Sequence, residues 1–247
     1  MFSNLFSDLL GSAGSGTRPA NQESAETLSH AVLHTPIGAP AAEGEGEVLF
    51  GCGCFWGAEK GFWRLPGVVT TAVGYAGGEG AAPSYEQVCS GRTGHAEVVR
   101  VLWNRERIDF SDLLKLFWEC HDPTQGNRQG NDRGSQYRSA IFVNEPELME
   151  LARASGETYA ALLAAAGHGP ITTEIGADRA FYPAEAYHQQ YLAKPGSRPY
   201  CSAQPSGVPL GPFPGASYRL PAAVWQAYDW SVAHCVLRGE NTPIVLP

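Results

Sequence analysis

The chain has 247 residues and a formal net charge of −8, and 43% of its residues are hydrophobic while 17% are charged. This length and hydrophobic content fit one globular domain with extensions and argue against a disordered chain. The negative charge argues against nucleic acid or an anionic membrane as the main partner, and no apolar run approaches the roughly 18 residues that span a bilayer. The first residues also lack the pattern of a secretory signal, so we expect a cytoplasmic protein.

Residues 1–46 are predicted to be an N-terminal extension. Residues 11–46 are rich in Gly, Ala, Ser, Pro and Glu, as in a linker or a loosely packed arm. Before them, apolar residues at helical spacing between positions 2 and 10 are compatible with a short amphipathic helix.

Residues 47–201 are predicted to form the main domain, because strand-like and helix-like segments alternate there. Short runs of β-branched and aromatic residues predict strands at 47–50, 69–75, 96–103, 139–143 and 171–175. Helical spacing predicts helices at 58–65, 113–120, 145–166 and 184–192, with Ser111 capping the second and Gly167 ending the third. Several connections are too short for parallel crossovers, so we expect an α+β fold. Its form would be a two-layer sandwich with a mixed, mainly antiparallel, ferredoxin-like sheet.

Residues 202–247 are predicted to be an irregular C-terminal tail. They are rich in Pro, Gly and Ser as far as about residue 214 and later include Trp225, Tyr228 and Trp230. The aromatic residues predict that the tail packs somewhere, but the sequence does not indicate where.

Residues 51–57 read Gly-Cys-Gly-Cys-Phe-Trp-Gly and lie where the first predicted strand turns through glycine into a helix. Cys54 would sit at the helix N-terminus, whose free N–H groups and dipole favour a thiolate, so it is the candidate nucleophile. Cys52 would lie on the strand as a small packed residue. Phe55 and Trp56 either form an apolar wall for a methyl or thioether group or belong to the core, and their spacing favours neither.

Glu97 is the candidate general acid. It follows a glycine-rich loop and enters a predicted strand. A carboxyl partly buried beside aromatic rings has a raised pKa and can donate a proton near neutral pH, although most glutamates at strand ends are simply solvated. The long polar loop at 121–139 is a further candidate for function.

Two other chemistries fit these residues less well. A structural metal is not expected, because Cys52 and Cys54 have no matching second pair and His95 has no companion at a ligand spacing. A cysteine hydrolase would use Cys54 with His95, His121 or His188 as the base, but none of these histidines has an evident amide partner.

Seven segments, all in order, resemble the A-type peptide methionine sulfoxide reductases. Among them, residues 53–57 (Gly-Cys-Phe-Trp-Gly) resemble the nucleophile signature and residues 84–97 the segment that bears the acid. The remaining similar segments are residues 74–78, 117–125, 129–139, 171–175 and 184–192. The resemblance extends from about residue 47 to residue 201.

The resemblance implies a reductase mechanism based on sulfenic acid chemistry. Cys54 would attack the sulfur of a methionine sulfoxide, methionine would leave, and Cys54 would become a sulfenic acid, while Glu97 would protonate the sulfoxide oxygen. A binding module without activity would be expected to lack Cys54 or Glu97, and both are present.

The same resemblance implies a set of substrate contacts. Tyr85 and Tyr137 would hydrogen-bond to the sulfoxide oxygen, and Asp132 would hold the backbone amide of the substrate. Phe55 and Trp56 would cage the methyl group and select the S epimer. The substrate would be methionine sulfoxide in proteins or as the free amino acid.

The resemblance further implies that Cys201 resolves the sulfenic acid as a disulfide with Cys54, which thioredoxin then reduces. The tail departs from the usual family ending, and it leaves two alternatives: Cys54 and Cys201 form the whole relay, or Cys235 accepts the disulfide in a second exchange. We expect no bound cofactor, no metal and a monomer.

Overall fold

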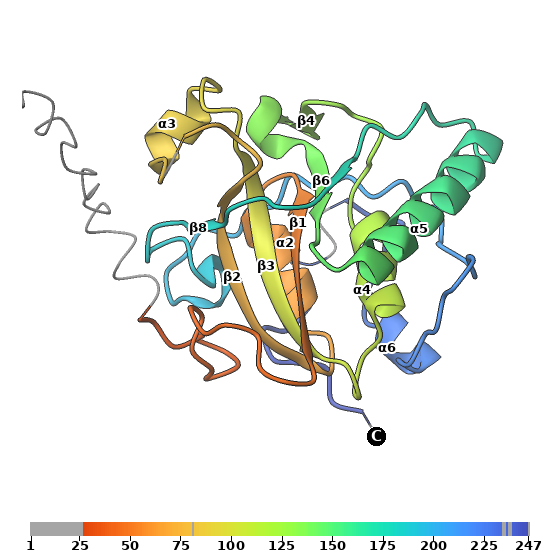
Figure 1. Ribbon diagram of the computed structural model, residues 1–247, viewed down its shortest axis with the longest axis horizontal. Helices are drawn as coiled ribbons and strands as arrows, with labels where there is room; N and C mark the ends of the chain where they lie inside the picture. The colour runs from red at the N-terminus through yellow and green to blue at the C-terminus, as the bar shows by residue number, and fades with distance from the viewer. Residues whose placement is uncertain (1–26, 81, 234–235, 237–238, 247) are drawn as a thin grey trace, which may run out of the picture.

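The computed structural model describes residues 27–80, 82–233, 236 and 239–246 (Figure 1). The amphipathic segment at 2–10 and Cys235 lie outside these residues. The strands are β1 (Glu45–Cys52), β2 (Val68–Ala76), β3 (Ala96–Asn104), β4 (Arg128–Gln129), β5 (Asp132–Arg133), β6 (Ser139–Phe142), β7 (Glu174–Gly176) and β8 (Tyr182–Pro183). The α-helices are α2 (Phe55–Trp63), α3 (Tyr85–Cys89), α4 (Phe110–Glu119), α5 (Pro146–Ala165) and α6 (Ala222–Trp225), and two short 3₁₀ helices span Ser135–Tyr137 and Tyr191–Ala193.

Six strands form one mixed sheet in the order β7-β6-β1-β3-β2-β8. The pairing is antiparallel except between β6 and β7, which run parallel. The predicted α+β class with a mainly antiparallel sheet is therefore confirmed. The ferredoxin-like detail stays a prediction, since β7 and β8 extend the sheet beyond its four long central strands.

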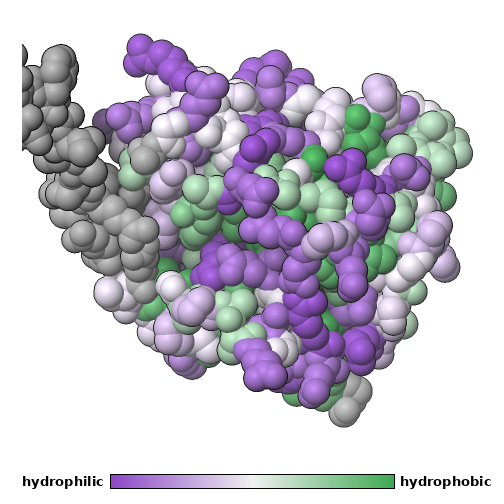
Figure 2. All heavy atoms as spheres, in the orientation of Figure 1, coloured by the Kyte–Doolittle hydropathy of each residue, from purple (hydrophilic) through white to green (hydrophobic). Residues whose placement is uncertain are grey.

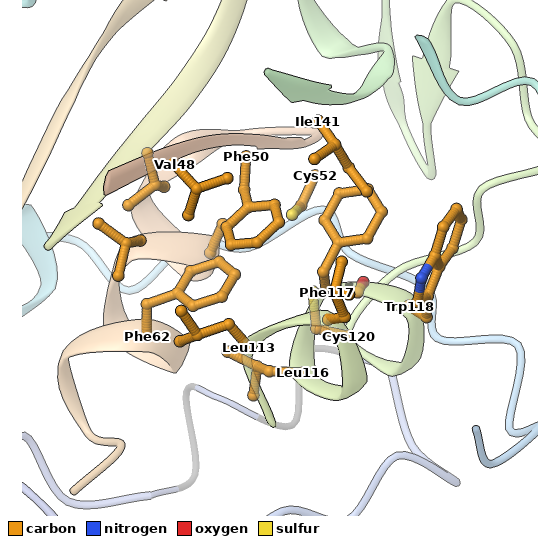
Figure 3. Close-up of a cluster of buried hydrophobic side chains, with 14 of the residues drawn as sticks. Val48, Phe50, Cys52, Phe62, Leu113, Leu116, Phe117, Trp118, Cys120 and Ile141 are labelled. Atoms are coloured by element: carbon orange, nitrogen blue, oxygen red, sulfur yellow. Dashed lines mark hydrogen bonds between the residues drawn. The ribbon is translucent and has the colours of Figure 1, made fainter. Parts of the chain in front are cut away.

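One face of the sheet packs against helices and forms the main core. Phe50 of β1 stacks on Phe62 of α2 and Phe117 of α4, with ring centroids 4.8 and 5.1 Å apart (Figure 3). Coil covers the opposite face: in Figure 1 the segment leading to β8 crosses in front of the sheet, whereas α2 lies behind it. Figure 2 shows that this coil-covered face presents mostly hydrophilic side chains, with hydrophobic residues visible between them.

The predicted helix at 184–192 is wrong. The structure has turns there and only a short 3₁₀ helix at its end. Gln190 has a left-handed backbone with φ of 46°, and the Gln189 side chain donates to Val73 O and accepts from Val73 N, both at 2.9 Å. These bonds to β2 replace the hydrogen bonds that a helix would make within itself.

Two smaller expectations also need correction. The cap of α4 is Asp109, not Ser111: the Asp109 carboxylate accepts from Ser111 N at 2.8 Å, and Ser111 Oγ instead accepts from Ser217 N. The last predicted strand begins at Glu174 rather than at residue 171.

The C-terminal tail packs along α2 and α4. The Asp112 carboxylate of α4 accepts from Arg219 N at 2.9 Å, and Tyr228 donates to Gly61 O of α2 at 2.9 Å. The buried apolar residues of the tail are Leu210, Phe213, Leu220, Val224, Tyr228 and Val236. No helix within the described residues is long and apolar enough to cross a membrane.

Candidate active site

Cys54 is the N-cap of α2, two residues beyond the end of β1. Gly53 makes the turn with φ of +86°, and a Cβ there would lie 2.6 Å from Gln129 Cβ, so both conformation and space require glycine. The Cys54 side chain is buried, with 9% of its surface exposed. The predicted strand, glycine turn and helix are present, and they place the thiol at the helix N-terminus.

Glu97 reaches the same helix N-terminus from β3. Residues at alternate positions of a strand share a face, so Glu97 points to the helix side together with Val99 and Val101, which belong to the main core. Its Oε2 accepts a hydrogen bond from Phe55 N at 3.0 Å. Burial raises the Glu97 pKa to about 8, and the charge of Asp132 adds to the rise. At neutral pH this carboxyl therefore holds a proton.

The thiol of Cys54 is not a preformed thiolate. Burial and the nearby charge of Glu97 raise the Cys54 pKa well above its ordinary value, and these effects outweigh the hydrogen bond from the Trp56 backbone, which lowers it. The expectation that the helix N-terminus alone would favour a thiolate is therefore too simple. Proton removal from Cys54 has to accompany the reaction.

Phe55 and Trp56 differ in their exposure. Phe55 is 1% exposed and belongs to the core, whereas Trp56 is partly exposed and packs against it. The Trp56 ring stacks on Tyr191 with centroids 3.9 Å apart, and its Nε1 donates to His188 Nδ1 at 3.2 Å. The ring of Trp56 is thus fixed in orientation beside Cys54.

Tyr85, Tyr137 and Asp132 come from three separate elements: α3, the 3₁₀ helix at Ser135–Tyr137 and β5. Burial raises the pKa of both tyrosines, and the charge of Glu97 contributes at each, so their hydroxyls stay protonated and lie near the acid. Asp132 Oδ1 accepts from Tyr200 at 2.5 Å, while Oδ2 is buried without a hydrogen-bond partner among the described residues. Oδ2 therefore has acceptor capacity that no described residue uses.

Sequence reasoning missed the residues that hold the turn at 184–192 over this site. His188 is 2% exposed, and burial lowers its pKa to about 4, so its ring is neutral. The turn is anchored by Glu59 of α2, whose carboxylate accepts from Gln190 N at 2.9 Å and from Gln190 Nε2 at 2.7 Å. The segment at 184–192 was recognised in the sequence, but it was predicted to be a helix, and a helix would not make these contacts.

The rival hydrolase arrangement is not present among the described residues, where no hydrogen bond joins Cys54 to a histidine. His121 is occupied by Phe117 O and Ser139 Oγ, both at 2.8 Å. His188 accepts from Trp56, and His95 lies in the loop before β3.

Cys201 packs directly on the first turn of α2. It is 5% exposed, and a Cβ at Gly57 would lie 2.5 Å from its Sγ, so glycine at position 57 makes room for the thiol. Burial raises the Cys201 pKa to about 12. The structure thus packs this thiol one helical turn from Cys54. Cys235 lies outside the described residues, but Val236, the next residue in sequence, lines the same small cavity as Cys201.

A cluster of Cys52, Cys120 and His121 also escaped the sequence analysis. Its sulfur and nitrogen atoms lie within 4.8 Å of one another, which is close enough for a metal ion. Both ring nitrogens of His121 are already hydrogen-bonded, so a metal bound there would displace one of these bonds.

A family model described as peptide methionine sulfoxide reductase matches residues 46–208. The chain belongs to the peptide methionine sulfoxide reductase family. The match includes every candidate site residue from Cys54 to Cys201 and excludes Cys235.

Named relatives of this reductase family support the assignment. The chain is 58% identical to peptide methionine sulfoxide reductase MsrA of Salinispora arenicola over 187 residues, 74% of this chain and 84% of that protein. It is 56% identical to the MsrA of Azotobacter vinelandii, over 74% of this chain and 85% of that protein.

Solved structures of reductases agree. Methionine sulfoxide reductase A of Corynebacterium diphtheriae superposes with a TM-score of 0.66 at 47% identity, over 73% of this chain and 87% of that one. Mxr1 of Saccharomyces cerevisiae in its reduced form gives a TM-score of 0.60 at 32% identity, over 71% of this chain and 96% of that one.

Proposed function

We propose that this chain reduces the S epimer of methionine sulfoxide to methionine, in proteins or as the free amino acid, and so repairs oxidised proteins. The observation that carries the proposal is the protonated, buried Glu97 at the helix N-terminus that holds Cys54. A sulfoxide oxygen is a poor leaving group until it is protonated, so the reaction needs an acid and a thiol on the same sulfoxide group.

Glu97 and Cys54 exchange protons in the chemical step. Glu97 gives its proton to the sulfoxide oxygen as Cys54 Sγ bonds to the sulfur, and the thiol proton then restores the Glu97 carboxyl. The protonated oxygen then passes from the methionine sulfur to Cys54 Sγ. A new Sγ–O bond forms as the S–O bond and the Sγ–S bond to the methionine sulfur break, so methionine leaves and Cys54 is a sulfenic acid. Because both groups are neutral beforehand, no buried charge has to be maintained before substrate binds.

The surrounding residues orient the sulfoxide. Tyr85 and Tyr137 are protonated donors near Glu97 and suit the sulfoxide oxygen. The buried Oδ2 of Asp132 suits the substrate amide, and the rings of Phe55 and Trp56 suit the methyl group. The sulfoxide oxygen, the methyl group and the rest of the substrate would each contact a different set of residues. Three different contacts around one sulfur atom distinguish its two epimers.

Cys201 resolves the sulfenic acid in this proposal. Its place against Gly57 is one helical turn from Cys54, so a short movement brings the two sulfurs together. Water leaves, the Cys54–Cys201 disulfide forms, and thioredoxin reduces it. Cys235 remains a candidate for a second exchange, supported by the place of Val236 beside Cys201.

The wider assignments belong to the same proposal. We assign residues 47–201 to catalysis, residues 1–46 and 202–247 to extensions, and the protein to the cytoplasm as a monomer without a bound cofactor or metal.

Steady-state assays with thioredoxin, thioredoxin reductase and NADPH test the function. A peptide with the S epimer is expected to sustain NADPH oxidation, and the same peptide with the R epimer is expected to remain unreduced. Equal rates on both epimers, or no methionine from either, would contradict the proposal.

A further inference from the structure

We propose that Cys52 and Cys120 form an internal dithiol reserve that reduces the Cys54–Cys201 disulfide when thioredoxin is absent. This inference rests on the proposed function, because the Cys54–Cys201 disulfide is its oxidant. It gives the protein a second methionine sulfoxide turnover without an external reductant.

The two thiols are brought together by separate elements. Cys52 is the last residue of β1, and Cys120 is the C-cap of α4. Their sulfurs lie within 4.8 Å of each other (Figure 3), and the side chains are 3% and 5% exposed. Their burial keeps solvent oxidants away from both thiols.

Cys201 faces this pair across one small cavity. Cys52, Cys120 and Cys201 all line it, together with Gly57 and Gly61 of α2. The two glycines leave this wall of the helix without side chains, so the cavity between the thiols stays open on that side. Cys120 is close enough to Cys201 that its charge raises the Cys201 pKa further.

His121 contacts the thiol of Cys120, which we take as the attacking thiol. Its Nδ1 lies 2.8 Å from Phe117 O, which fixes a proton on this nitrogen, and 3.8 Å from Cys120 Sγ. The pKa of Cys120 is raised by its hydrogen bond with Cys52 and by burial, and the contact with His121 opposes this rise. We therefore expect an exchange that is slower than recycling by thioredoxin.

The exchange balances within the chain. Cys120 Sγ attacks Cys201 Sγ, the Cys54–Cys201 bond breaks, and Cys54 leaves as a thiolate that takes up the Cys120 proton. Cys52 Sγ then attacks Cys120 Sγ of the mixed disulfide, and Cys201 leaves and takes up the Cys52 proton. One disulfide is reduced, one is formed, and Cys54 is free to reduce a second sulfoxide.

The test counts methionine released by the reduced full-length chain without any reductant. A Cys235→Ser chain removes the other candidate thiol and is expected to release two methionines per chain with excess substrate. Peptide mapping is expected to find both Cys54–Cys201 and Cys52–Cys120. The Cys235→Ser, Cys120→Ser chain is expected to release one, whereas the matched Cys235→Ser, Cys89→Ser chain, which lacks an exposed cysteine, should still release two.

The outcomes separate this inference from the function. One methionine from the Cys235→Ser chain, with Cys54–Cys201 as the only disulfide, would overturn the reserve and leave the function intact. No methionine at all would instead contradict the proposed function. Because peptide mapping of the Cys235→Ser chain needs no change at Cys120, the inference stays testable if the Cys120 variant fails to fold.

Discussion

We propose Glu97 as the acid because of where its strand places it. The residue alternates with Val99 and Val101 on the core face of β3, so its carboxyl is buried and its pKa rises to about 8. The same burial keeps Cys54 protonated. A buried pair that is neutral at rest suits a reaction that moves one proton between the two groups.

Glu97→Gln is expected to slow methionine release by roughly 10²–10⁴ while changing KM little, since the amide fills the same space but has no proton to transfer. For the wild type, the acid is present below about pH 8, so the rate of the chemical step is expected to fall as pH rises through that value. Stopped-flow measurement of the first turnover checks both points.

Glu79→Gln provides the control for Glu97→Gln, because Glu79 is exposed and undergoes the same change from carboxyl to amide. The Glu79→Gln variant should release methionine at the wild-type rate, and this rate should still fall as pH rises through about 8. A Glu97→Gln rate within threefold of the wild type would contradict the acid role.

Gly57→Ala is expected to slow formation of the Cys54–Cys201 disulfide without slowing formation of the sulfenic acid on Cys54. Its Cβ would lie 2.5 Å from Cys201 Sγ and displace this thiol, so sulfenic acid should form normally on Cys54 and persist. Mass spectrometry with a sulfenic acid trap measures the persistence. Gly61→Ala, whose Cβ meets Leu116 at 3.4 Å, is the matched control and should close normally. Equal closure in both chains would show that the contact with Gly57 does not position Cys201.

The turn at 184–192 links the core to the proposed aromatic cage, which is formed by the rings of Phe55 and Trp56. The Glu59 carboxylate accepts hydrogen bonds from Gln190 N, Gln190 Nε2 and Thr71 Oγ1. The turn also holds His188 and Tyr191 against the ring of Trp56. Burial raises the Glu59 pKa to about 7. The turn is therefore held by one buried carboxyl together with the two hydrogen bonds between Gln189 and Val73.

Glu59→Gln is expected to lower the free energy of unfolding by about 1–3 kcal/mol, because the amide N–H₂ group faces donors of Gln190 and leaves them unpaired. KM should rise as the cage loosens. The pKa of Glu59 is higher in the folded state than in the unfolded state. Its contribution to the free energy of unfolding is therefore present at low pH and is lost as pH rises through about 7. The difference in free energy of unfolding between the wild type and Glu59→Gln should narrow over the same pH range.

Denaturant unfolding at several pH values measures the effect at Glu59, and the exposed Glu150→Gln is the control. An unchanged KM together with unchanged stability in Glu59→Gln would contradict the anchoring role.

At the scale of the whole molecule, the tail completes the layer of helices. Val224 of α6 is fully buried, and the charged side chains Asp112 and Glu119 of α4 bond to tail backbone at Arg219 N and Leu210 N. The tail is therefore part of the fold and not an appendage to it.

Val224→Ala is expected to lower the free energy of unfolding by about 1–3 kcal/mol through lost burial and a small cavity. Val245→Ala makes the same change at a tail residue that is 87% exposed and should have no measurable effect. Thermal unfolding compares the two, and equal melting temperatures would indicate that the tail does not pack as described.

Local patterns predicted most of the central fold and the main catalytic pair. Cys54 follows a glycine just after β1, and Glu97 lies at the start of β3 after a glycine-rich loop, so both positions have strong local sequence signals. The bond from Gln190 to Glu59 spans 131 residues, and the tail contacts span more than 90, so no local pattern could reveal them. The proximity of Cys52 and Cys120 was missed for the same reason, because only the packing of β1 against α4 brings these two thiols together.

The central claim is that Cys54 takes the oxygen of methionine sulfoxide. A single-turnover experiment on Cys201→Ser with a sulfenic acid trap tests it most directly. We expect one methionine per chain and one trapped sulfenic acid, located on Cys54 by peptide mapping. Methionine release without a label on Cys54, or a label on another cysteine, would contradict the assignment.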